Sequence, residues 1–319
     1  MDKLFLITVG VLITLNYIST SPTIFGTPVA CVCPTGRSQT SARLFFGGSN
    51  CCTPSTNKGV VLIGGSNKAS PAPESFSCSE TFADTVLLLY RPGAAVLNNQ
   101  LYYCGGFNFN NFNDTDKCFK NERGNWVAVP SMNEPKYFQT MTTVGSYILV
   151  TGGYSSISTD PFGALDSVDI FDGAVWVKLP YTLSSRRAGH CAVPVSDTEI
   201  LIIGGTFGNK TLVAEKYNIF TGDITSIPSS SIERYGHACA MLNGEVYVSG
   251  GIALQFANRK KFDVVEVTKQ GGGIIDSITD SVEVLNLETL KWRTISPMNT
   301  TRGYHTMEVV NAELTVFGG

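Results

Sequence analysis

Short apolar strands that end in a pair of glycines recur along this chain. The strands, such as VVLI, LYYC and ILVT, are rich in β-branched and aromatic residues, which is typical of β-structure. The spacing between successive pairs is fairly regular, except that the last interval is the longest. A self-similar period of about 50 residues predicts a repeat architecture. The pairs are Gly64-Gly65, Gly105-Gly106, Gly152-Gly153, Gly204-Gly205, Gly250-Gly251 and Gly318-Gly319.

Three further strands share this period. Before four of the pairs, a basic residue followed three positions later by Gln or His leads into a strand, and this element ends at a nearly constant distance from the pair. A third strand, acidic and apolar, follows the pair, and a fourth is marked by Trp126, Trp176, Trp292 or, in one repeat, Ile224. Four short strands bounded by turn residues predict one antiparallel meander per repeat. The leading elements are Lys136-x-x-Gln139, Arg187-x-x-His190, Arg234-x-x-His237 and Arg302-x-x-His305, and third strands lie at 168–172, 214–218 and 282–286.

Together these features resemble the signature of the kelch-repeat family, which also places a Pro-Met before the Arg-x-x-His. Residues 94–319 carry the signature well, and residues 59–94 carry it loosely. The resemblance implies an all-β fold, a kelch-type β-propeller with one blade of four antiparallel strands per repeat. Closure of the blades into a ring is also expected on physical grounds, because a four-stranded sheet with two apolar faces needs a neighbouring blade to cover each face. The six glycine pairs predict six blades.

Both ends of the repeat array depart from the pattern. The segment Arg43-Leu-Phe-Phe-Gly-Gly imitates a repeat end too soon before Gly64, and the first repeat has only 86–90, without Trp, as its fourth strand. The last repeat stops at its glycine pair, so its third and fourth strands are absent from the sequence. Two interpretations remain open. Either the N-terminal segment supplies the missing strands and closes the ring, or the sequence is a fragment with an incomplete last blade.

Positions 1–20 are expected to be a secretory signal peptide. Lys3 precedes an apolar run at 4–15, which gives way to small and polar residues at 19–21. This run is too short for a bilayer, which needs about 20 apolar residues. A buried strand and an uncleaved anchor are the alternatives. No later stretch predicts a membrane span, and we divide the chain into the signal at 1–20, a Cys-rich segment at 21–58 and the propeller at 59–319.

Glycosylation sequons and cysteine use agree with export, and the charge balance bears only on nucleic-acid binding. Charged residues make up 15% of the chain, and a net charge of −3 with a pI near 5.7 gives no basic footprint for nucleic acid. Five of the nine cysteines lie in the first quarter and are expected to form a disulfide staple, with at least one thiol left free or paired with another chain. A metal site at Cys31-x-Cys33 and Cys51-Cys52 is disfavoured because the spacing is wrong and no histidine is near. Three glycosylation sequons begin at Asn113, Asn209 and Asn299.

The conspicuous residues of the repeats are expected to be structural. His190, His237 and His305 are the only histidines, and all occupy one repeat position, whereas a catalytic centre needs unlike residues that converge. The matching arginines are expected to bond loop carbonyls or neighbouring acids, and the tryptophans to wedge between blades. A propeller enzyme such as a galactose-oxidase-like copper oxidase needs two His and two Tyr around its metal. This chain has only three histidines, and the repeat already explains each of them. We therefore expect no catalytic residue, no metal and no cofactor.

Variation between repeats lies in the loops that join strands two to three and one blade to the next, which emerge on the same face. Three of these loops are long, at 107–116, 154–165 and 252–275, and the last of them explains the longest interval between glycine pairs. Exposed aromatic and basic groups on a rigid scaffold are a common means of recognition. A mobile, solvated insertion is the alternative for 252–275. The candidate binding residues are Phe107, Phe109, Phe112, Tyr154, Phe256, Arg259, Lys260 and Lys261.

These observations predict a secreted, extracellular, non-catalytic binding module whose ligand is a protein or a glycan. The alternatives are a propeller enzyme of the oxidase class, and an intracellular kelch scaffold if the N-terminus is not a signal. Because Asn113, Asn209 and Asn299 all fall in loops of the same face, we expect their glycans to cover part of it. Protein binding would then concentrate near the 252–275 insertion.

Overall fold

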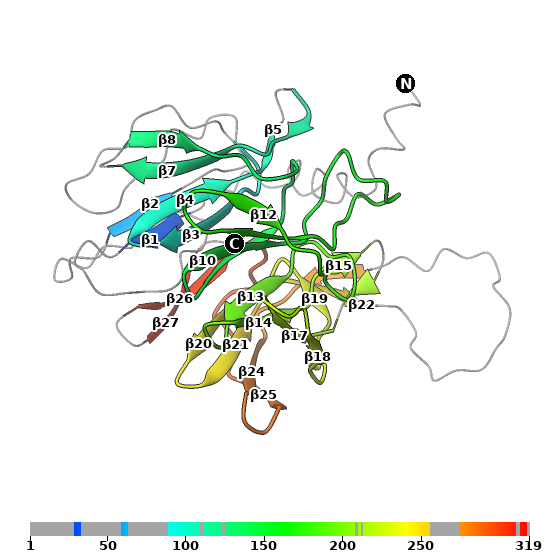
Figure 1. The fold of residues 1–319 in the computed structure, drawn as a ribbon. Helices are drawn as coiled ribbons and strands as arrows, with labels where there is room; N and C mark the ends of the chain where they lie inside the picture. Colours follow the sequence, from blue (N-terminus) through cyan, green and yellow to red (C-terminus); the bar gives the residue numbers. More distant parts are fainter. Residues whose placement is uncertain are drawn as a thin grey trace, which may run out of the picture.

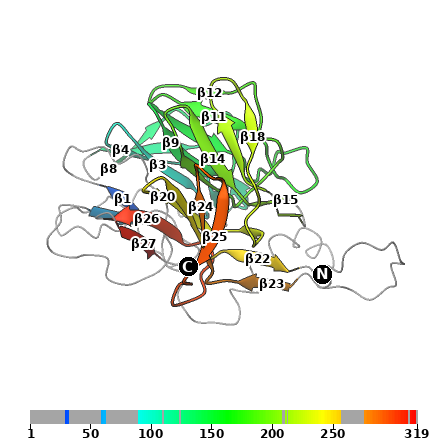
Figure 2. The same ribbon diagram turned by 90° about the horizontal axis from the view of Figure 1, so that it is seen from below.

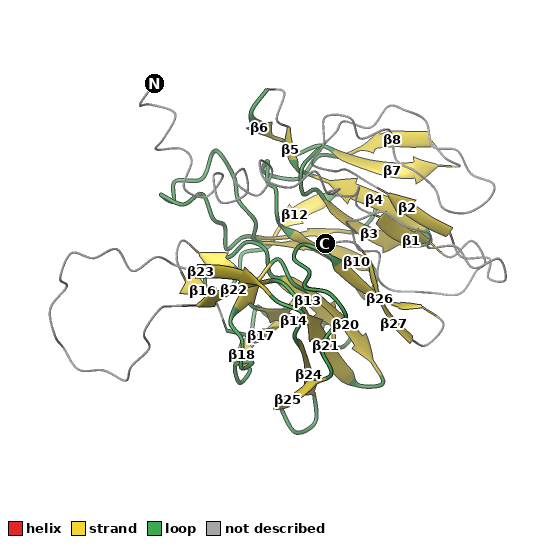
Figure 3. Ribbon diagram, turned by 180° about the vertical axis from the view of Figure 1, so that it is seen from behind, coloured by secondary structure: helices red, strands yellow, loops and turns green. Residues whose placement is uncertain are grey.

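The fold is built from β-strands. The computed structural model describes residues 29–32, 59–62, 89–108, 111–122, 125–207, 210–211, 213–255, 275–310 and 313–317, and within these ranges it contains strands and loops but no helix (Figure 3). The signal peptide and nearly all of the Cys-rich segment expected at the N-terminus therefore lie outside the described residues. Within the described ranges no segment could cross a membrane as a helix.

Four complete antiparallel blades have the strand order that the repeats predict. In each blade the four strands follow one another as a meander, and the glycine pair follows the second strand. The blades are β3 (Gly93–Leu97), β4 (Gln100–Cys104), β7 (Cys118–Glu122), β8 (Asn125–Val129); β9 (Thr140–Val144), β10 (Tyr147–Thr151), β11 (Val168–Phe171), β12 (Trp176–Lys178); β13 (Cys191–Pro194), β14 (Glu199–Ile203), β17 (Glu215–Asn218), β18 (Ile224–Ser226); and β20 (Ala238–Leu242), β21 (Glu245–Ser249), β24 (Val282–Asn286), β25 (Lys291–Ile295).

Two further hairpins complete the set of six that ends at the six glycine pairs. They are β1 (Val29–Val32) with β2 (Gly59–Leu62), and β26 (Thr306–Val310) with β27 (Glu313–Phe317). Figures 1 to 3 place β1–β2 between β26–β27 and the β3–β8 blade. Among the described residues, β1 pairs only with β2 and adds no strand to the β26–β27 hairpin, which has two strands.

The first strand of each blade lies nearest to a common axis. Strands β3, β9, β13, β20 and β26 lie side by side in this order, and the blades follow one another around the centre in chain order (Figures 1 and 2). Threonine hydroxyl groups link neighbouring inner strands. Thr140 Oγ1 donates to the His190 carbonyl at 2.8 Å, and Thr143 Oγ1 donates to the Val96 carbonyl at 2.6 Å. This arrangement is a β-propeller, as the sequence predicts.

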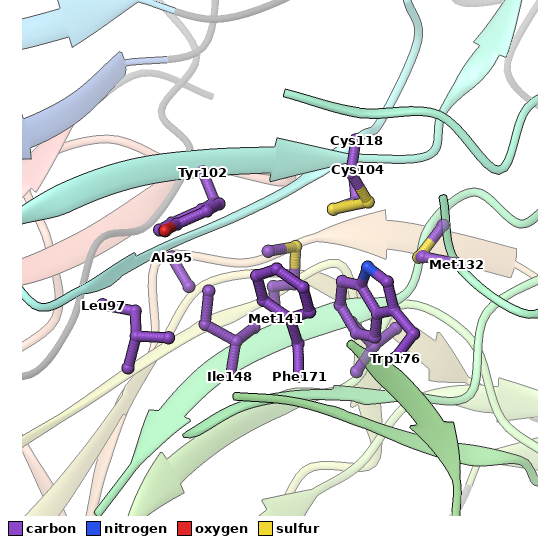
Figure 4. Packing of buried hydrophobic residues seen from close by; sticks show 11 residues of the cluster. Ala95, Leu97, Tyr102, Cys104, Cys118, Met132, Met141, Ile148, Phe171 and Trp176 are labelled. Atoms are coloured by element: carbon purple, nitrogen blue, oxygen red, sulfur yellow. A yellow bond between two sulfur atoms is a disulfide. The ribbon is translucent and has the colours of Figure 1, made fainter. Parts of the chain in front are cut away.

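Apolar side chains from adjacent blades interdigitate between the sheets. Figure 4 shows the cluster between the β3–β8 and β9–β12 blades, where Tyr102 meets Phe171 edge-on at 5.6 Å between ring centroids. Trp176 stacks on Phe171 at 4.7 Å, and its indole N–H donates to the carbonyl of Pro130 in the preceding linker at 3.0 Å. Trp292 repeats this bond to Pro228 at 2.7 Å. These two tryptophans therefore wedge between blades, which confirms the predicted role.

Two disulfides involve the four cysteines outside the N-terminal cluster. Cys104 and Cys118 lie opposite each other in β4 and β7, with 4.2 Å between their Cα atoms, so this bond lies within one blade. Cys191 and Cys239 lie in β13 and β20, with 6.0 Å between their Cα atoms, so this bond joins the inner strands of adjacent blades. The sequence pattern does not reveal these pairings, because both depend on inter-strand register.

Three of the loops between second and third strands contain regular backbone pairing. They fold back as short ribbons: β5 (Phe107–Asn108) with β6 (Asn113–Asp114), β15 (Thr206–Phe207) with β16 (Lys210–Thr211), and β22 (Ile252–Gln255) with β23 (Ile275–Ile278). The ribbon at the base of the 252–275 insertion also pairs with β19 (Arg234–Tyr235). Backbone pairing therefore fixes the base of this insertion, whereas residues 256–274 lie outside the described part of the chain.

Candidate binding site at the propeller axis

Four-residue linker segments before the inner strands organise one face of the propeller. We call these segments linker tetrads; they are residues 89–92, 136–139, 187–190, 234–237 and 302–305. Antiparallel meandering places them on the same face as the ribbons between second and third strands. The second residue of each of four tetrads pairs with its own ribbon or loop, in the bridges Tyr90–Phe107, Tyr137–Tyr154, Ala188–Thr206 and Tyr235–Ile252.

In three of the tetrads the first position carries a buried cation that holds its blade together. Lys136 Nζ lies 2.6 Å from Asp169 Oδ2, and Arg234 Nη2 lies 2.6 Å from Glu283 Oε2. Arg187 Nη2 lies 3.1 Å from Glu215 Oε1, and its guanidinium also donates to the carbonyls of Gly204 and Val213. The acids are those of the third strands, so the predicted structural role is confirmed for Arg187 and Arg234.

The fourth tetrad position is occupied by the histidines. His190 Nε2 lies 2.8 Å from the Thr151 hydroxyl of the preceding blade, and His305 Nε2 lies 2.8 Å from the Ser249 hydroxyl. Burial lowers the pKa of His190 well below its ordinary value, and the nearby Arg187 adds to the shift. Burial, followed by Arg302 and Arg234, lowers the pKa of His305 to about 3. Both imidazoles are neutral at physiological pH, and both bridge adjacent blades.

Glycine is required at the glycine pairs because the histidine side chains and the tetrad backbone lie too close to leave room for a Cβ atom. A Cβ atom on Gly250 would lie 2.5 Å from His305 Cε1, and one on Gly251 would lie 2.7 Å from His237 Cβ. Gly251 N–H also donates to the Arg302 carbonyl at 2.7 Å, and the same bond recurs at three other pairs. Each pair is therefore a backbone stitch between one blade and the next.

The third tetrad position forms a ring around the axis, which we call the axial collar. Four of its five members donate their backbone N–H to the carbonyl of the preceding member: Phe138 to Arg91 at 3.0 Å, Gly189 to Phe138 at 3.1 Å, Gly236 to Gly189 at 2.7 Å, and Tyr304 to Gly236 at 2.6 Å. All five residues have left-handed φ values, between 51° and 65°. This conformation is costly for bulky side chains and marks a position held by its surroundings.

The side chains of the axial collar close its mouth with a caged arginine. The Cζ atom of Arg91 lies 3.4 Å from the Tyr304 ring centroid, 4.1 Å from that of Phe138 and 4.6 Å from that of Tyr90. The two glycines make room for these rings, because a Cβ atom on Gly189 would lie 2.4 Å from Phe138 Cζ and one on Gly236 would lie 2.5 Å from the Tyr304 ring.

Arg91 is buried without an acidic partner. Its exposed fraction is 9%, and among the described residues no carboxylate lies within ion-pair distance of its guanidinium. Burial alone would lower the pKa of Arg91, but Tyr90, Tyr304 and Tyr235 reverse this effect and raise the pKa above its ordinary value. The guanidinium therefore remains charged inside an aromatic enclosure.

Below the axial collar lies a cavity of about 140 Å³. Its walls are the axial collar, the fourth tetrad residues and the first residues of the inner strands. Arg91 is the only Lys, Arg, Asp or Glu among the lining residues that the structure describes. The cavity is thus a small axial chamber lined by the charged Arg91 and by the neutral imidazoles of His190 and His305.

A continuous run of aromatic rings leads from the ribbons to the axial collar. Successive ring centroids are 5.3 to 6.3 Å apart along Phe107, Tyr137, Tyr154, Phe138, Tyr304 and Tyr235. Burial raises the pKa of Tyr137 and of Tyr304 to about 12, so both phenols stay neutral. The face around the axis therefore presents aromatic rings that surround the buried guanidinium of Arg91.

The structure brings together two of the predicted binding residues. Phe107 and Tyr154 both pack against Tyr137, whereas Phe112 points outward from the tip of the β5–β6 ribbon with 73% of its surface exposed. The sequons at Asn113 and Asn299 are exposed in loops of the same face. The other predicted sites lie outside the described residues; they are Phe109, Phe256, Arg259, Lys260, Lys261 and Asn209.

Sequence reasoning missed Arg91 and the rest of the axial collar. The first tetrad reads Leu89-Tyr90-Arg91-Pro92, which lacks both the basic residue and the histidine of the repeat signature. One signal could have located it, because the spacing from Pro92 to Gly105 equals the spacing from Gln139 to Gly152. Among the described residues, no group of His, Cys, Asp and Glu is placed to hold a metal ion.

Antiparallel four-stranded blades around an axis, joined by glycine-pair stitches, define the class of this protein as a repeat-built β-propeller. The family model for the kelch motif matches residues 233–299. Kelch-like protein 15 of Mus musculus is 25% identical over 202 residues, which are 61% of this chain and 31% of that protein. Kelch-like protein 36 of Rattus norvegicus is 24% identical over 210 residues, 64% of this chain and 30% of that protein. These matches support the kelch-repeat family for this chain.

Two further similarities extend the comparison. Alpha-scruin of Limulus polyphemus is 28% identical over 123 residues, 35% of this chain and 13% of that protein. The solved structure of YjhT superimposes with a TM-score of 0.55 at 17% identity, covering 75% of this chain and 73% of that one. The fold is therefore a kelch-type β-propeller, as the sequence predicts. The matched part of the chain spans about a third or less of the length of each curated relative.

Proposed function

We propose that this protein is a secreted, non-catalytic binding module that presents its axial face to a protein partner. The observation that carries the proposal is the aromatic run from Phe107 to Tyr235, which crosses several blades on one face and ends at the charged axial mouth. Aromatic side chains with an arginine at the centre are the residue types that dominate binding energy at protein interfaces. The relatives are named as kelch-like proteins and a scruin, and these names suggest no catalytic activity.

Apolar side chains beside this run extend the surface. Phe112, Ile157 and Phe162 are large and apolar, with exposed fractions of 73%, 65% and 59%. They lie in two neighbouring loops that Asp114 ties together, since its carboxylate accepts hydrogen bonds from the backbone N–H of Ser156 at 3.0 Å and from the Ser156 hydroxyl. Exposed apolar groups gathered on one face favour a partner protein as their cover.

The loop that carries Ile157 and Phe162 is also ordered before any partner arrives. Asp160 Oδ2 accepts hydrogen bonds from the backbone N–H groups of Phe162 at 2.9 Å and Ala164 at 3.3 Å. Arg186 lies 3.4 Å from the other oxygen of the same carboxylate. A loop that is already ordered loses less conformational entropy on association, which favours binding.

Site-specific photo-crosslinking tests the choice of face. A photoreactive residue at Phe162 is expected to capture a partner from extracellular fluid, and the same residue at Phe220 is not. Phe220 is a matched control because its exposed fraction is 55%, against 59% for Phe162, and it lies in the loop between β17 and β18 on the opposite face. A partner captured equally at both positions, or only at Phe220, contradicts the proposal.

Secretion and glycosylation form the second part of the proposal. The short apolar run at 4–15, the three sequons and the two disulfides support it, because disulfides persist in oxidising compartments. Expression of the full chain in a secretory cell is expected to give exported protein cleaved near residue 20, with glycans at Asn113 and Asn299. N-terminal sequencing and glycopeptide mapping measure both. Retention of the intact N-terminus inside the cell instead favours an intracellular scaffold.

A further inference from the structure

Arg91 is the exception among the deeply buried cations of the described propeller. Lys136, Arg187 and Arg234 each meet a carboxylate from the third strand of their own blade. Arg91 instead lies against the rings of Tyr90, Phe138 and Tyr304, and neither these rings nor the phenol groups of the two tyrosines neutralise its charge. A buried charge is stabilised most by an opposite charge with hydrogen bonds, and the described part of the chain supplies no such group to Arg91.

The cage dictates how such a group could approach. The rings of Phe138 and Tyr304 lie 4.1 Å and 3.4 Å from Arg91 Cζ, so a ligand on the guanidinium faces would have to displace them. The N–H donors of guanidinium lie at its edges, in a planar fork that matches the two oxygens of a carboxylate. A flat anion therefore fits this setting better than a tetrahedral one.

The chamber beneath the axial collar has room for a small ligand, and no described acidic side chain in its wall competes with that ligand for Arg91. Its volume of about 140 Å³ is close to the roughly 150 Å³ that holds a benzene-sized molecule in an engineered protein cavity. No acidic side chain lies among its described lining residues. His190 and His305 line it as neutral imidazoles, and their Nδ1 atoms have no hydrogen-bond partner among the described residues.

We propose that the axial mouth is a carboxylate-binding site in which Arg91 receives the carboxylate of an acidic side chain or of a chain terminus. This inference rests on the proposed function, because the protein partner supplies the carboxylate. Phe138 and Tyr304 exclude water from the pair and hold the guanidinium in place. Gly189 and Gly236 lack side chains and so leave the room in which the rings of Phe138 and Tyr304 pack beside Arg91.

Four short peptides serve as probes for the full-length secreted protein. Acetyl-Gly-Gly-Glu-Gly-Gly-amide presents a side-chain carboxylate, and its Gln counterpart is neutral. Acetyl-Gly-Gly-Gly with a free terminus presents a terminal carboxylate, and its amide is neutral. In NMR titrations, at least one charged peptide is expected to bind about tenfold more tightly than its neutral counterpart, and the stronger of the two identifies the source. Equal affinities within both pairs overturn the proposal, as does tighter binding of inorganic phosphate than of either charged peptide.

Variants connect the effect to Arg91. Arg91→Met is expected to reduce the tenfold preference to less than twofold, and Arg91→Lys, which keeps the charge but loses the planar fork, to reduce it several-fold. Arg293→Met is the matched control because Arg293 is half-exposed on β25 and paired with Glu245, outside the axial collar and the loops beside it, and its loss is expected to leave the preference unchanged. If Arg91→Met does not fold, Arg91→Lys and the wild-type peptide pairs still decide. A preference that survives in a folded Arg91→Met protein overturns the assignment.

The two proposals fail separately. If the peptides discriminate by charge but no partner is captured at Phe162, the carboxylate site stands and the protein-binding role fails. If a partner is captured at Phe162 but the charged and neutral peptides bind equally, the binding role stands and the carboxylate site fails.

Discussion

The five residues of the axial collar share one backbone conformation and differ only in side chain. Arg91, Phe138 and Tyr304 adopt φ values of 51°, 59° and 61°, a region that glycine enters at little cost and other residues rarely enter. Phe138 can adopt it because its backbone N–H and carbonyl both bond to neighbours in the ring. The loss of stability on replacing Gly189 or Gly236 therefore depends on the aromatic ring that packs over that glycine.

Gly189→Ala separates the steric effect from the backbone effect. A left-handed φ costs a residue with a Cβ about 1–2 kcal/mol, and the overlap with Phe138 at 2.4 Å adds about 1–3 kcal/mol. Gly244→Ala is the control, since Gly244 has a φ of 77° but no atom within 4 Å of its Cβ position. Chemical denaturation is expected to show a larger loss for Gly189→Ala, and equal losses contradict the packing around the axial collar.

His305→Gln tests the neutral state of the buried histidines. Because the folded pKa of His305 is about 3 and that of an unfolded histidine is about 6.5, the unfolded chain binds a proton first. The stability associated with this site is therefore intact above pH 6.5 and decreases as the pH falls toward 3. Gln139 occupies the same repeat position and donates to the Cys104 carbonyl at 2.9 Å, so glutamine is accommodated there. The variant is expected to unfold at a lower pH than the wild type in an acid titration followed by circular dichroism, and an unchanged midpoint refutes this account.

A blade is stabilised at its third strand, where one acid meets one cation from a linker tetrad. Glu283 in β24 accepts from Arg234, from the Ser231 hydroxyl at 2.6 Å and from the Ser231 backbone N–H at 2.7 Å. This bond therefore ties the third strand of the blade to the linker that enters it. The arrangement explains why acidic residues recur in strands that are otherwise apolar.

Glu283→Gln is expected to cost about 3–5 kcal/mol of unfolding free energy, because it leaves the buried guanidinium of Arg234 without its counter-ion. Glu245→Gln in the same sheet is the matched control. Glu245 bonds to the half-exposed Arg293 at 2.8 Å, and exposed pairs contribute about 0–1 kcal/mol. Denaturant titration of both variants measures the difference, and similar losses would show that the buried pair is not essential to the blade.

The sequence predicts the blades well because their residues recur. Trp176, Arg187 and His190 each act through neighbours that lie at fixed distances in the same or the preceding repeat, so periodicity is sufficient to assign their roles. The ribbons were not predictable in the same way. Their strands, such as 206–207 with 210–211, are too short for a periodic pattern, and they form because the tetrad backbone beside them supplies a partner.

At the scale of the whole molecule, the two disulfides have different tasks. Cys104–Cys118 links residues 14 apart within one blade, and Cys191–Cys239 links residues 48 apart across two inner strands. The axial collar also belongs to this scale, since its members come from five tetrads and become neighbours only when the ring assembles. The spacing from Pro92 to Gly105 could have located the first tetrad in the sequence, but only the assembled ring shows that Arg91 lies at the axis.

Removal of each disulfide distinguishes these tasks. Chain-entropy arguments give about 4 kcal/mol for a loop of 48 residues and about 3 kcal/mol for one of 14. The double variant Cys191→Ala with Cys239→Ala is therefore expected to melt at a lower temperature than Cys104→Ala with Cys118→Ala. Calorimetry of the two variants provides the comparison, and the reverse order would show that the inter-blade bond does not restrain the unfolded chain.

The hydrogen-bonded ring of the axial collar separates the shape of the main chain from the choice of side chain. Glycine, phenylalanine, tyrosine and arginine all occupy it with closely similar φ values, from 51° to 65°. Five positions with the same backbone conformation thus surround one point on the axis, and each can carry a different side chain. Evolution, or a designer, could change what this propeller recognises by exchanging these side chains alone, while every blade and every stitch between blades stays in place.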